Sequence, residues 1–161
     1  DGSCFQSFTL FEQTRRCSSR HQVFSIAVAR ILITDDDDGM RAMMTAILTM
    51  RGHDVVEAQT ARAAIQTHRD QPADVIITDL VMKEMDGIEL LRRIRAFSPD
   101  TPIIAISGDE HGKIYLNMAK LVGAERMLAK PFLADQLLRA VDEVLGVPPV
   151  SGERGSASGE A

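Results

Sequence analysis

Four short apolar runs in this chain each end at polar residues that could take part in phosphoryl chemistry. Asp35 and Asp36 follow residues 30–34, Asp79 follows 75–78, Ser107 follows 103–106 and Lys130 follows 127–129. Three carboxylates offer the hard oxygen ligands that Mg²⁺ prefers, and a hydroxyl and an ammonium could hold the oxygens of a phosphoryl group. Gathered in one pocket, these groups would form a magnesium-dependent site that accepts a phosphoryl group.

The elements that would gather these groups are the strands of a parallel sheet. The runs at 75–78 and 103–106 are apolar without alternation, which is typical of strands covered by helices on both faces. Helical periodicity between the runs indicates that strands and helices alternate. We therefore predict an α/β fold, doubly wound in (βα)5 order around a five-stranded parallel sheet. The carboxyl ends of such strands share one edge, where ligands bind at the switch point.

Helices are predicted where apolar residues recur at intervals of three and four. They span about 39–51, 61–69, 88–97, 112–123 and 133–145, and a short strand is predicted at 54–58. In the first helix the predicted buried stripe contains Met40, Met43, Met44, Ile47 and Leu48. We expect its methionines to fill the core. Asp37 and Asp38 are expected to lie in a solvated turn at the start of this helix.

All of these elements fall in one predicted domain at residues 30–146, a length at which a single core can bury most of its apolar surface. Residues 1–29 lack a sustained period, and we expect an extension that is poorly ordered or was added for expression. Its apolar stretch at 23–29 is too short for a membrane span. Residues 147–161 are rich in Gly, Ser and Pro and are expected to be a flexible tail or a truncated linker.

Charge and cysteine content narrow the class of function. Residues 31–146 carry 13 Lys and Arg against 19 Asp and Glu, a net charge of −6, which argues against direct nucleic-acid binding. Both cysteines, Cys4 and Cys17, lie outside the predicted domain, so no disulfide or cysteine-based metal site supports the fold. The histidines lack metal-ligand spacing. A reducing, cytoplasmic location is the simplest interpretation.

The proposed pocket has a definite chemistry. Asp35, Asp36 and Asp79 would repel one another unless a cation neutralised them, and Mg²⁺ accepts carboxylates together with waters and phosphate oxygens. Asp79 could then attack an activated phosphoryl group and form an aspartyl phosphate. Lys130 would pair with the phosphoryl oxygens, and the Ser107 hydroxyl would donate a hydrogen bond to one of them. Each residue alone is ordinary, but their joint placement at four strand ends favours a site.

Four motifs occur in order along residues 30–145, namely ILITDDDD, VIITDLVMKEMDGIELL, IIAISG and LAKPF. Together they resemble the receiver domain of response regulators, the family of bacterial two-component signalling, in a chemotaxis-regulator-like form. The resemblance implies a flavodoxin-like fold, Mg²⁺ as cofactor, and a phosphohistidine on a sensor histidine kinase or phosphotransfer protein as the donor. It also implies a signalling domain rather than an enzyme, either stand-alone or part of a longer chain. Such a domain switches its interaction with a downstream effector protein and can form a homodimer through its last two βα units.

The resemblance also assigns roles to individual residues. These are, in chain order, Asp35 and Asp36 as the acidic pair, with Asp36 the more direct metal ligand, Asp79 as the phosphoacceptor, Val81 as a metal ligand through its backbone carbonyl, Ser107 as the hydroxyl that moves to meet the phosphoryl group, and Lys130 as the conserved lysine before a usually cis Pro131.

Two residues depart from the family pattern. Many receivers have an aromatic residue three positions before the lysine, where this chain has Met127. The usual aromatic switch is therefore not expected here, and two routes stay open, repacking of the flexible thioether or an output that runs mainly through the Ser107 loop and the fourth helix. Lys83 stands where the family commonly has proline, and it should loosen the loop after Asp79 without removing a catalytic group.

Two other functions stay open at this stage. A haloacid-dehalogenase-like phosphatase also has an aspartate nucleophile and a second aspartate after its first strand. That family has Thr or Val after the Asp-Gly pair, whereas Met40 follows Asp38 and Gly39 here. The other alternative is a degenerate receiver that binds partners without phosphorylation. Met127 favours this alternative, and the complete set of site residues speaks against it.

Overall fold

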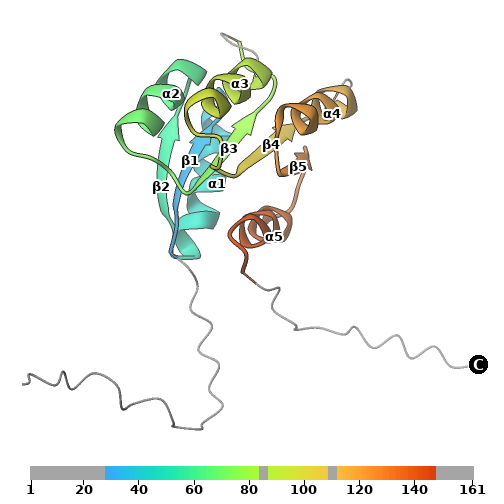
Figure 1. Cartoon of the computed structure of the whole chain (residues 1–161). Coiled ribbons are helices and arrows are strands. Elements are labelled where there is room, and N and C mark those ends of the chain that lie inside the picture. Colours follow the sequence, from blue (N-terminus) through green and yellow to red (C-terminus); the bar gives the residue numbers. More distant parts are fainter. Residues whose placement is uncertain (1–27, 84–86, 109–111, 148–161) are drawn as a thin grey trace, which may run out of the picture.

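A computed structural model describes residues 28–83, 87–108 and 112–147 of the chain, so the predictions for most of 1–29 and 147–161 lie outside the described residues. Strands and helices alternate along this part of the chain (Figure 1). The strands are β1 (Arg30–Thr34), β2 (Asp54–Ala58), β3 (Val75–Asp79), β4 (Ile103–Ser107) and β5 (Arg126–Ala129). The helices are α1 (Asp38–Met50), α2 (Ala61–Asp70), α3 (Gly87–Phe97), α4 (Gly112–Val122) and α5 (Ala134–Val144). Within the described residues, no helix is both long enough and apolar enough to span a membrane.

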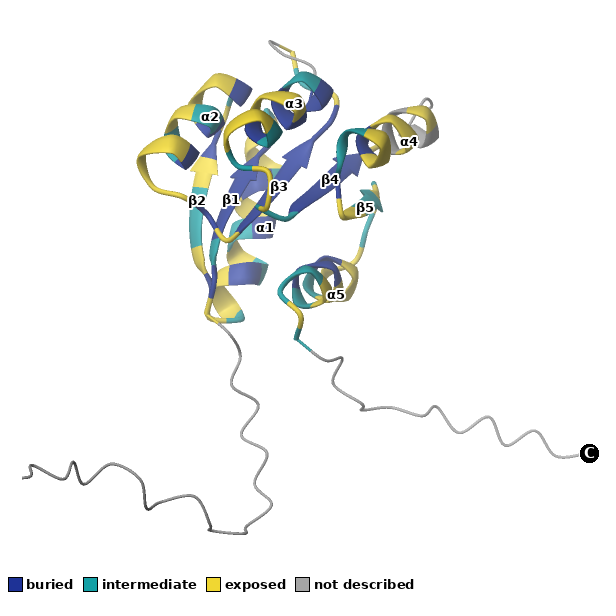
Figure 2. Ribbon diagram, viewed as in Figure 1, coloured by how far each residue is buried: buried dark blue, intermediate teal, exposed yellow. Residues whose placement is uncertain are grey.

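The strands form one parallel sheet with the order β2-β1-β3-β4-β5, which is the flavodoxin-like order. The predicted doubly wound (βα)5 fold with a five-stranded parallel sheet is therefore confirmed. Every residue of β3 and β4 is buried, because helices cover both faces of the sheet (Figure 2). The edge strands β2 and β5 are partly exposed, which explains why their sequences are less uniformly apolar.

The sheet separates two apolar clusters, one on each face. Successive side chains of a strand point to opposite faces, so Ile31 and Ile33 of β1 lie in one cluster and Leu32 lies in the other. The first cluster is completed from α1 and α5, by Met44, Leu48, Leu137 and Val141. The second is completed from α2, α3 and α4, by Ala64, Leu91, Ile94 and Ala119. Helices α1 and α5 thus cover one face and the other three helices cover the opposite face.

Helix α1 begins at Asp38 because Asp37 caps its first turn. Asp37 Oδ1 accepts a hydrogen bond from the Met40 N–H at 2.9 Å. This bond lowers the pKa of the Asp37 carboxyl, since it favours the ionised form. Asp37 and Asp38 are both exposed, so the prediction of a solvated turn at the start of this helix is confirmed.

The buried stripe of α1 differs from the prediction at one position. Met44 and Leu48 are fully buried as expected, but Met43 is 39 % exposed, and its assignment to the core is wrong. Arg41 instead shares the buried face with Met44 and Leu48. The helix is therefore turned so that a guanidinium, and not a thioether, lies at the end of the stripe near β1.

The site lies where the connections of two neighbouring strands diverge. Helix α1 follows β1 onto one face of the sheet, and α3 follows β3 onto the other. Strands β1 and β3 are paired, so their carboxyl ends border the switch point at which ligands bind in open α/β sheets. The polar residues singled out in the sequence lie at this edge.

At the opposite edge, a buried histidine ties α2 to the segments that enter β3 and β4. His68 Nδ1 accepts the Ala73 N–H at 3.0 Å, and its Nε2 lies 3.5 Å from the Thr101 hydroxyl. Because Nδ1 accepts, the ring proton is assigned to Nε2. The ring also packs against Phe97, with centroids 5.7 Å apart. Burial lowers the pKa of His68, and protonation at Nδ1 would break its bond from Ala73.

We expect the free energy of unfolding to fall as the pH drops through the ordinary histidine pKa of about 6.5, because His68 is held neutral in the fold and gains a proton on unfolding. The contribution is fully present above that pH and declines below it, by at most about 1.4 kcal/mol per pH unit. Urea unfolding of the native protein and of His68→Gln, at about pH 7.5 and about pH 5.5, measures this decline. The decline should be shallower in the variant.

His53 contributes to the same decline in stability, because burial also lowers its pKa. A double variant, His53→Gln with His68→Gln, should show the shallowest decline. An identical decline in the native protein and in His68→Gln would contradict the assignment of His68 as a neutral buried ring.

Candidate functional site

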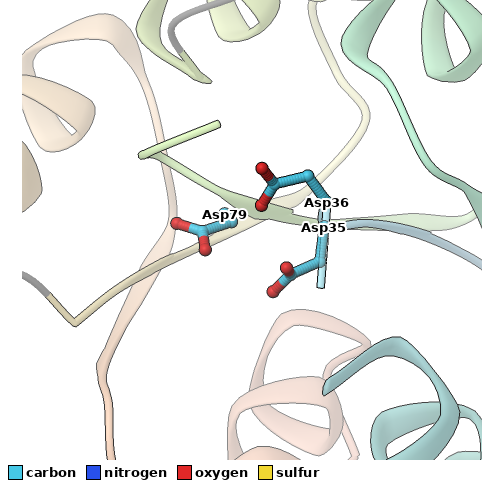
Figure 3. A group of neighbouring side chains, drawn as sticks. All are labelled: Asp35, Asp36 and Asp79. Atoms are coloured by element: carbon cyan, nitrogen blue, oxygen red, sulfur yellow. The ribbon is translucent and has the colours of Figure 1, made fainter. Parts of the chain in front are cut away.

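Three carboxylates meet at the carboxyl edge of the sheet. Asp35 and Asp36 directly follow β1, and Asp79 is the last residue of the neighbouring strand β3. Figure 3 shows the three side chains gathered at this edge, and one oxygen from each lies within 4.8 Å of the others. Asp35 and Asp79 are buried, and Asp36 is half-buried. Two of the three charges are therefore largely removed from water, which requires compensating groups nearby.

The Lys130 ammonium lies between the two buried carboxylates. Lys130 directly follows β5, and its Nζ donates to Asp35 Oδ2 at 2.9 Å and to Asp79 Oδ2 at 2.5 Å. Burial acts to lower the pKa of Lys130, but the hydrogen bonds and charges of Asp79 and Asp35 outweigh burial and raise the pKa above its ordinary value. Lys130 is therefore protonated at neutral pH and offsets one of the three negative charges.

Backbone N–H groups hold the other oxygen of each buried carboxylate. Asp35 Oδ1 accepts from the Asp37 N–H at 2.8 Å, and Asp79 Oδ1 accepts from the Val81 N–H at 2.9 Å. Each carboxylate thus has one oxygen on the backbone two residues ahead and the other on Lys130. These contacts fix the direction in which both carboxylates point before any ligand arrives.

The electrostatics of the site call for more positive charge than Lys130 supplies. The pKa of Asp35 is raised, because burial outweighs its hydrogen bonds from Asp37 and Lys130, and Asp79 adds repulsion. Asp36 is held loosely, with its Oδ2 at 3.4 Å from the Lys83 N–H nitrogen and 3.8 Å from the exposed Lys83 Nζ. Even with Lys130 and the distant Lys83 counted, the three carboxylates retain negative charge, and their oxygen donors fit a hard divalent cation such as Mg²⁺.

A buried hydroxyl without a partner ends the next strand. Ser107 is the last residue of β4, and its Oγ has no hydrogen-bond partner among the described residues. The Lys130 N–H donates to the Ser107 carbonyl at 2.8 Å, and the following Lys130–Pro131 peptide bond is cis, as the resemblance implied. Gly108 permits this close approach, because a Cβ there would lie 2.7 Å from Lys130 Cβ. The Ser107 hydroxyl could therefore donate a hydrogen bond to a ligand that binds at this edge.

Helix α3 begins in direct contact with the end of β3. The Gly87 N–H donates to the Leu80 carbonyl at 3.1 Å. A Cβ at Gly87 would lie 2.5 Å from the Asp79 carbonyl oxygen and 2.6 Å from Leu80 Cα, both of which are backbone atoms. A residue without a side chain is therefore needed here, because the helix packs against the backbone that carries Asp79.

The structure gathers four of the predicted site residues around one point, namely Asp35, Asp36, Asp79 and Lys130. Ser107 ends the strand between β3 and β5. Val81 donates its N–H to Asp79, and the role predicted for its carbonyl oxygen stays a prediction. The catalytic and metal-binding roles of all these residues likewise stay predictions.

One residue at the site was missed by the sequence analysis. The guanidinium of Arg41 is buried and donates from Nη1 to the Asp35 carbonyl oxygen at 2.6 Å. Its signal in the sequence is that Arg41 stands in helical register with Met44 and Leu48, at intervals of three and four. An arginine in register with an apolar stripe indicates a buried, paired cation, because arginine is almost never fully buried unless paired.

Comparisons with known proteins agree with this geometry. A family model for the response regulator receiver domain matches residues 31–142. The chain is 34% identical over 117 residues to the chemotaxis protein CheY of Bacillus subtilis (strain 168), a match that covers 72% of this chain and 97% of CheY. It is 33% identical over 118 residues to the transcriptional regulatory protein GlrR of Escherichia coli (strain K12), where the match covers 73% of this chain and 26% of GlrR.

Solved structures give the same result. The crystal structure of NtrX from Brucella abortus is similar with a TM-score of 0.71 at 29% identity, covering 74% of this chain and 27% of that one. The chemotaxis protein CheY4 of Vibrio cholerae is similar with a TM-score of 0.68 at 32% identity, covering 73% of this chain and 99% of CheY4. The predicted resemblance and fold are confirmed, and the matched unit occurs both alone and within longer proteins.

We expect Gly87→Ala to lower the free energy of unfolding by about 1–3 kcal/mol, because the new methyl group must push the backbone of β3 away from α3. Urea unfolding measures the change. Gly39→Ala in the first turn of α1 is the matched control, since the nearest atom to a Cβ there is the Asp37 Oδ1 at 3.2 Å. It should change stability by less than about 1 kcal/mol. Equal effects of the two substitutions would contradict the close packing inferred at Gly87.

Proposed function

The chain belongs to the response regulator receiver domain family, and from this premise we propose that Asp79 accepts a phosphoryl group in a Mg²⁺-dependent reaction that switches protein–protein interactions. The observation that carries the proposal is the convergence of three carboxylates and the Lys130 ammonium at one edge of the sheet. A buried structural ion pair would need only one carboxylate for Lys130. The three acidic groups are better explained by a site that also receives a divalent cation.

In the proposal, Mg²⁺ is held by the carboxylates of Asp35, Asp36 and Asp79 and by the backbone carbonyl of Val81. When bound, the ion neutralises the carboxylates and the negative oxygens of the incoming phosphoryl group. The half-buried Asp36 is the most accessible of the three carboxylates, which suits its predicted role as the more direct ligand. Support for this ligand set comes from its oxygen-only donors and from the residual negative charge of the site.

Asp79 acts as the nucleophile in the proposed reaction. One of its carboxylate oxygens forms a bond to phosphorus while the P–N bond of a phosphohistidine breaks, and the electron pair of that bond leaves on the imidazole nitrogen. Lys130 already contacts Asp79, so it needs only a small movement to pair with a phosphoryl oxygen as a point charge. Positioning and electrostatics supply most of the catalysis in phosphoryl transfer, and the contacts of Asp79 and Lys130 support such a role.

Ser107 supplies the link to the proposed switch. Its buried hydroxyl lacks a partner among the described residues, and a phosphoryl oxygen on Asp79 would accept its hydrogen bond. The segment after Ser107 leads into α4, so movement of the hydroxyl would be transmitted to the surface of α4, β5 and α5. Met127 of β5 is partly buried against the apolar cluster under α4 and can repack there in place of the usual aromatic residue.

The partners in the proposal follow from this chemistry. The donor is a sensor histidine kinase or a phosphotransfer protein, and the output is a downstream effector protein or a second copy of the domain. The negative charge of the predicted domain disfavours direct binding to nucleic acid. Phosphohistidine donors are made from ATP, so the proposal includes a cytoplasmic location. Catalysis by the domain itself is confined to phosphorylation and dephosphorylation of Asp79, so it is a signalling domain and not an enzyme in the usual sense.

Intact mass after incubation with phosphoramidate tests the function directly. We expect a gain of one phosphoryl group that requires Mg²⁺ and is absent in Asp79→Asn, because the amide cannot act as the nucleophile. Labelling of Asp79→Asn would refute the assignment of the phosphoacceptor. Absence of labelling in the native chain under all conditions would favour a degenerate receiver, and donor turnover without a stable adduct would favour a phosphatase.

Replacement of Lys130 separates metal binding from phosphoryl transfer. We expect Lys130→Met to bind Mg²⁺ at least as tightly as the native chain, because a competing cation is removed, while labelling slows by about 100-fold. Calorimetric titration and the time course of intact mass measure the two properties. Lys120→Met, at an exposed position of α4, is the control and should leave both unchanged. Native labelling rates in Lys130→Met would exclude the role proposed for this lysine.

A further inference from the structure

Arg41 connects the acidic end of β1 to the edge strand β2. It lies on the buried face of α1, and its side chain is only 11 % exposed. The guanidinium donates from Nη1 to the Asp35 carbonyl oxygen at 2.6 Å, from Nη2 to the Asp38 carboxylate, and from Nε to Glu57 Oε2 at 3.4 Å. All three nitrogens of one buried guanidinium are therefore engaged, by the residue that follows β1, by the first residue of its own helix and by β2.

Arg41 contacts the backbone of Asp35 and not its carboxylate. The oxygen that accepts from Arg41 belongs to the peptide bond that joins Asp35 to Asp36. The orientation of this peptide plane sets the directions in which both side chains leave the backbone. Arg41 therefore acts on the backbone between the two acids, whereas Lys130 acts on the carboxylate of Asp35 itself. The two cations fix different parts of the same acidic pair.

The far end of this connection is anchored as well. Glu57 is near the carboxyl end of β2, and its second oxygen accepts from the Thr45 hydroxyl at 2.7 Å. Asp38 is further approached by the Gln59 amide at 3.5 Å. Glu57 of β2 is thus hydrogen-bonded to α1 through both Arg41 and Thr45. A planar fork with fixed donors is well suited to such a brace, and a lysine could not engage three acceptors in this geometry.

We propose that Arg41 is a positioning residue for the magnesium site, which orients the Asp35–Asp36 peptide so that both carboxylates face Asp79. This inference rests on the proposed function, because it concerns the same site. The inference adds a residue that the sequence analysis did not include in the site. This residue links Glu57 of β2 to the backbone of Asp35. In this arrangement Arg41 donates to Asp38, Glu57 and a carbonyl oxygen, so it does not itself pair with the three carboxylates of the site.

A positioning role and a purely electrostatic role predict opposite results. Removal of a nearby positive charge alone would make the site more negative and tighten Mg²⁺ binding. Loss of the brace would let the peptide turn and would weaken binding, by about 10–100-fold as for other groups that orient metal ligands. Arg41→Lys keeps the charge but loses the fork, so a charge role predicts no change in affinity and a positioning role predicts weaker binding.

The chain offers a matched control at the opposite edge of the sheet. Arg95 is also largely buried, with a side chain 17 % exposed, and it donates to the carbonyl oxygens of Pro99 at 3.0 Å and Thr101 at 2.5 Å. It also donates to the Gly123 carbonyl at 2.6 Å, so it braces two loops as Arg41 does. Arg95→Met should therefore lower stability by a comparable amount without altering the affinity for Mg²⁺.

The experiment is calorimetric titration of the full chain with MgCl₂, together with urea unfolding of each variant. We expect Arg41→Met to weaken Mg²⁺ binding by about tenfold or more, Arg41→Lys to weaken it by a smaller factor, and Arg95→Met to stay within about twofold of the native affinity. Native or tighter binding by folded Arg41→Met, or equal weakening by Arg95→Met, would overturn the inference. If Arg41→Met does not fold, Arg41→Lys decides, and native affinity in that variant would overturn the inference.

Asp36→Ala separates failure of this inference from failure of the proposed function. Binding by the native chain that is lost in Asp36→Ala supports the metal site, and the Arg41 variants then decide the inference. Absence of Mg²⁺ binding by the native chain would overturn both the proposed function and the role of Arg41.

Discussion

The structure depends on one buried arrangement of charge, in which the Lys130 ammonium bridges Asp35 and Asp79. Two like charges removed from water are tolerated only when a counter-charge and hydrogen bonds hold them. Here Lys130 and one backbone N–H serve each carboxylate. This arrangement holds the carboxyl ends of β1, β3 and β5 close to one another. It explains why the surrounding backbone packs so closely and why small residues stand at its contact points.

The two edges of the sheet meet this constraint in different ways. At the amino edge, Arg95 and His68 hold the connecting loops through hydrogen bonds, although the buried Nε2 of His53 has no partner among the described residues. At the carboxyl edge, two buried carboxylates share Lys130, Asp36 has only a long contact to the exposed Lys83, and the Ser107 hydroxyl has no partner among the described residues. In the proposed function, ligands at the carboxyl edge would supply the positive charge and the hydrogen-bond acceptor that the described residues of this edge lack.

The alternation of strands and helices and the edge at which the site lies were predicted from local signals, whereas the flavodoxin-like strand order was implied by the family resemblance. Uninterrupted apolar runs indicate buried parallel strands, and the residue after each run must lie at the carboxyl edge. The orientation of α1 could not be predicted in the same way. Met43 and Arg41 compete for the buried face, and Arg41 is buried because Glu57 of β2 and the Asp35 carbonyl accept its donors. Those partners come from separate segments, so periodicity within the helix does not show them.

The hydrogen bond that Ser107 would gain sets how far phosphorylation could shift the proposed two-state equilibrium. A ligand shifts a two-state equilibrium only by the difference in its interaction with the two states. A phosphoryl oxygen that satisfies the buried Ser107 hydroxyl would contribute about 1–3 kcal/mol, which corresponds to a shift of about 5–150-fold. Met127 of β5 can then follow at low cost, because a flexible thioether repacks more easily than an aromatic ring. In the proposed switch, with Met127 in place of an aromatic residue, the hydroxyl at the end of β4 would then supply much of the free energy for the change.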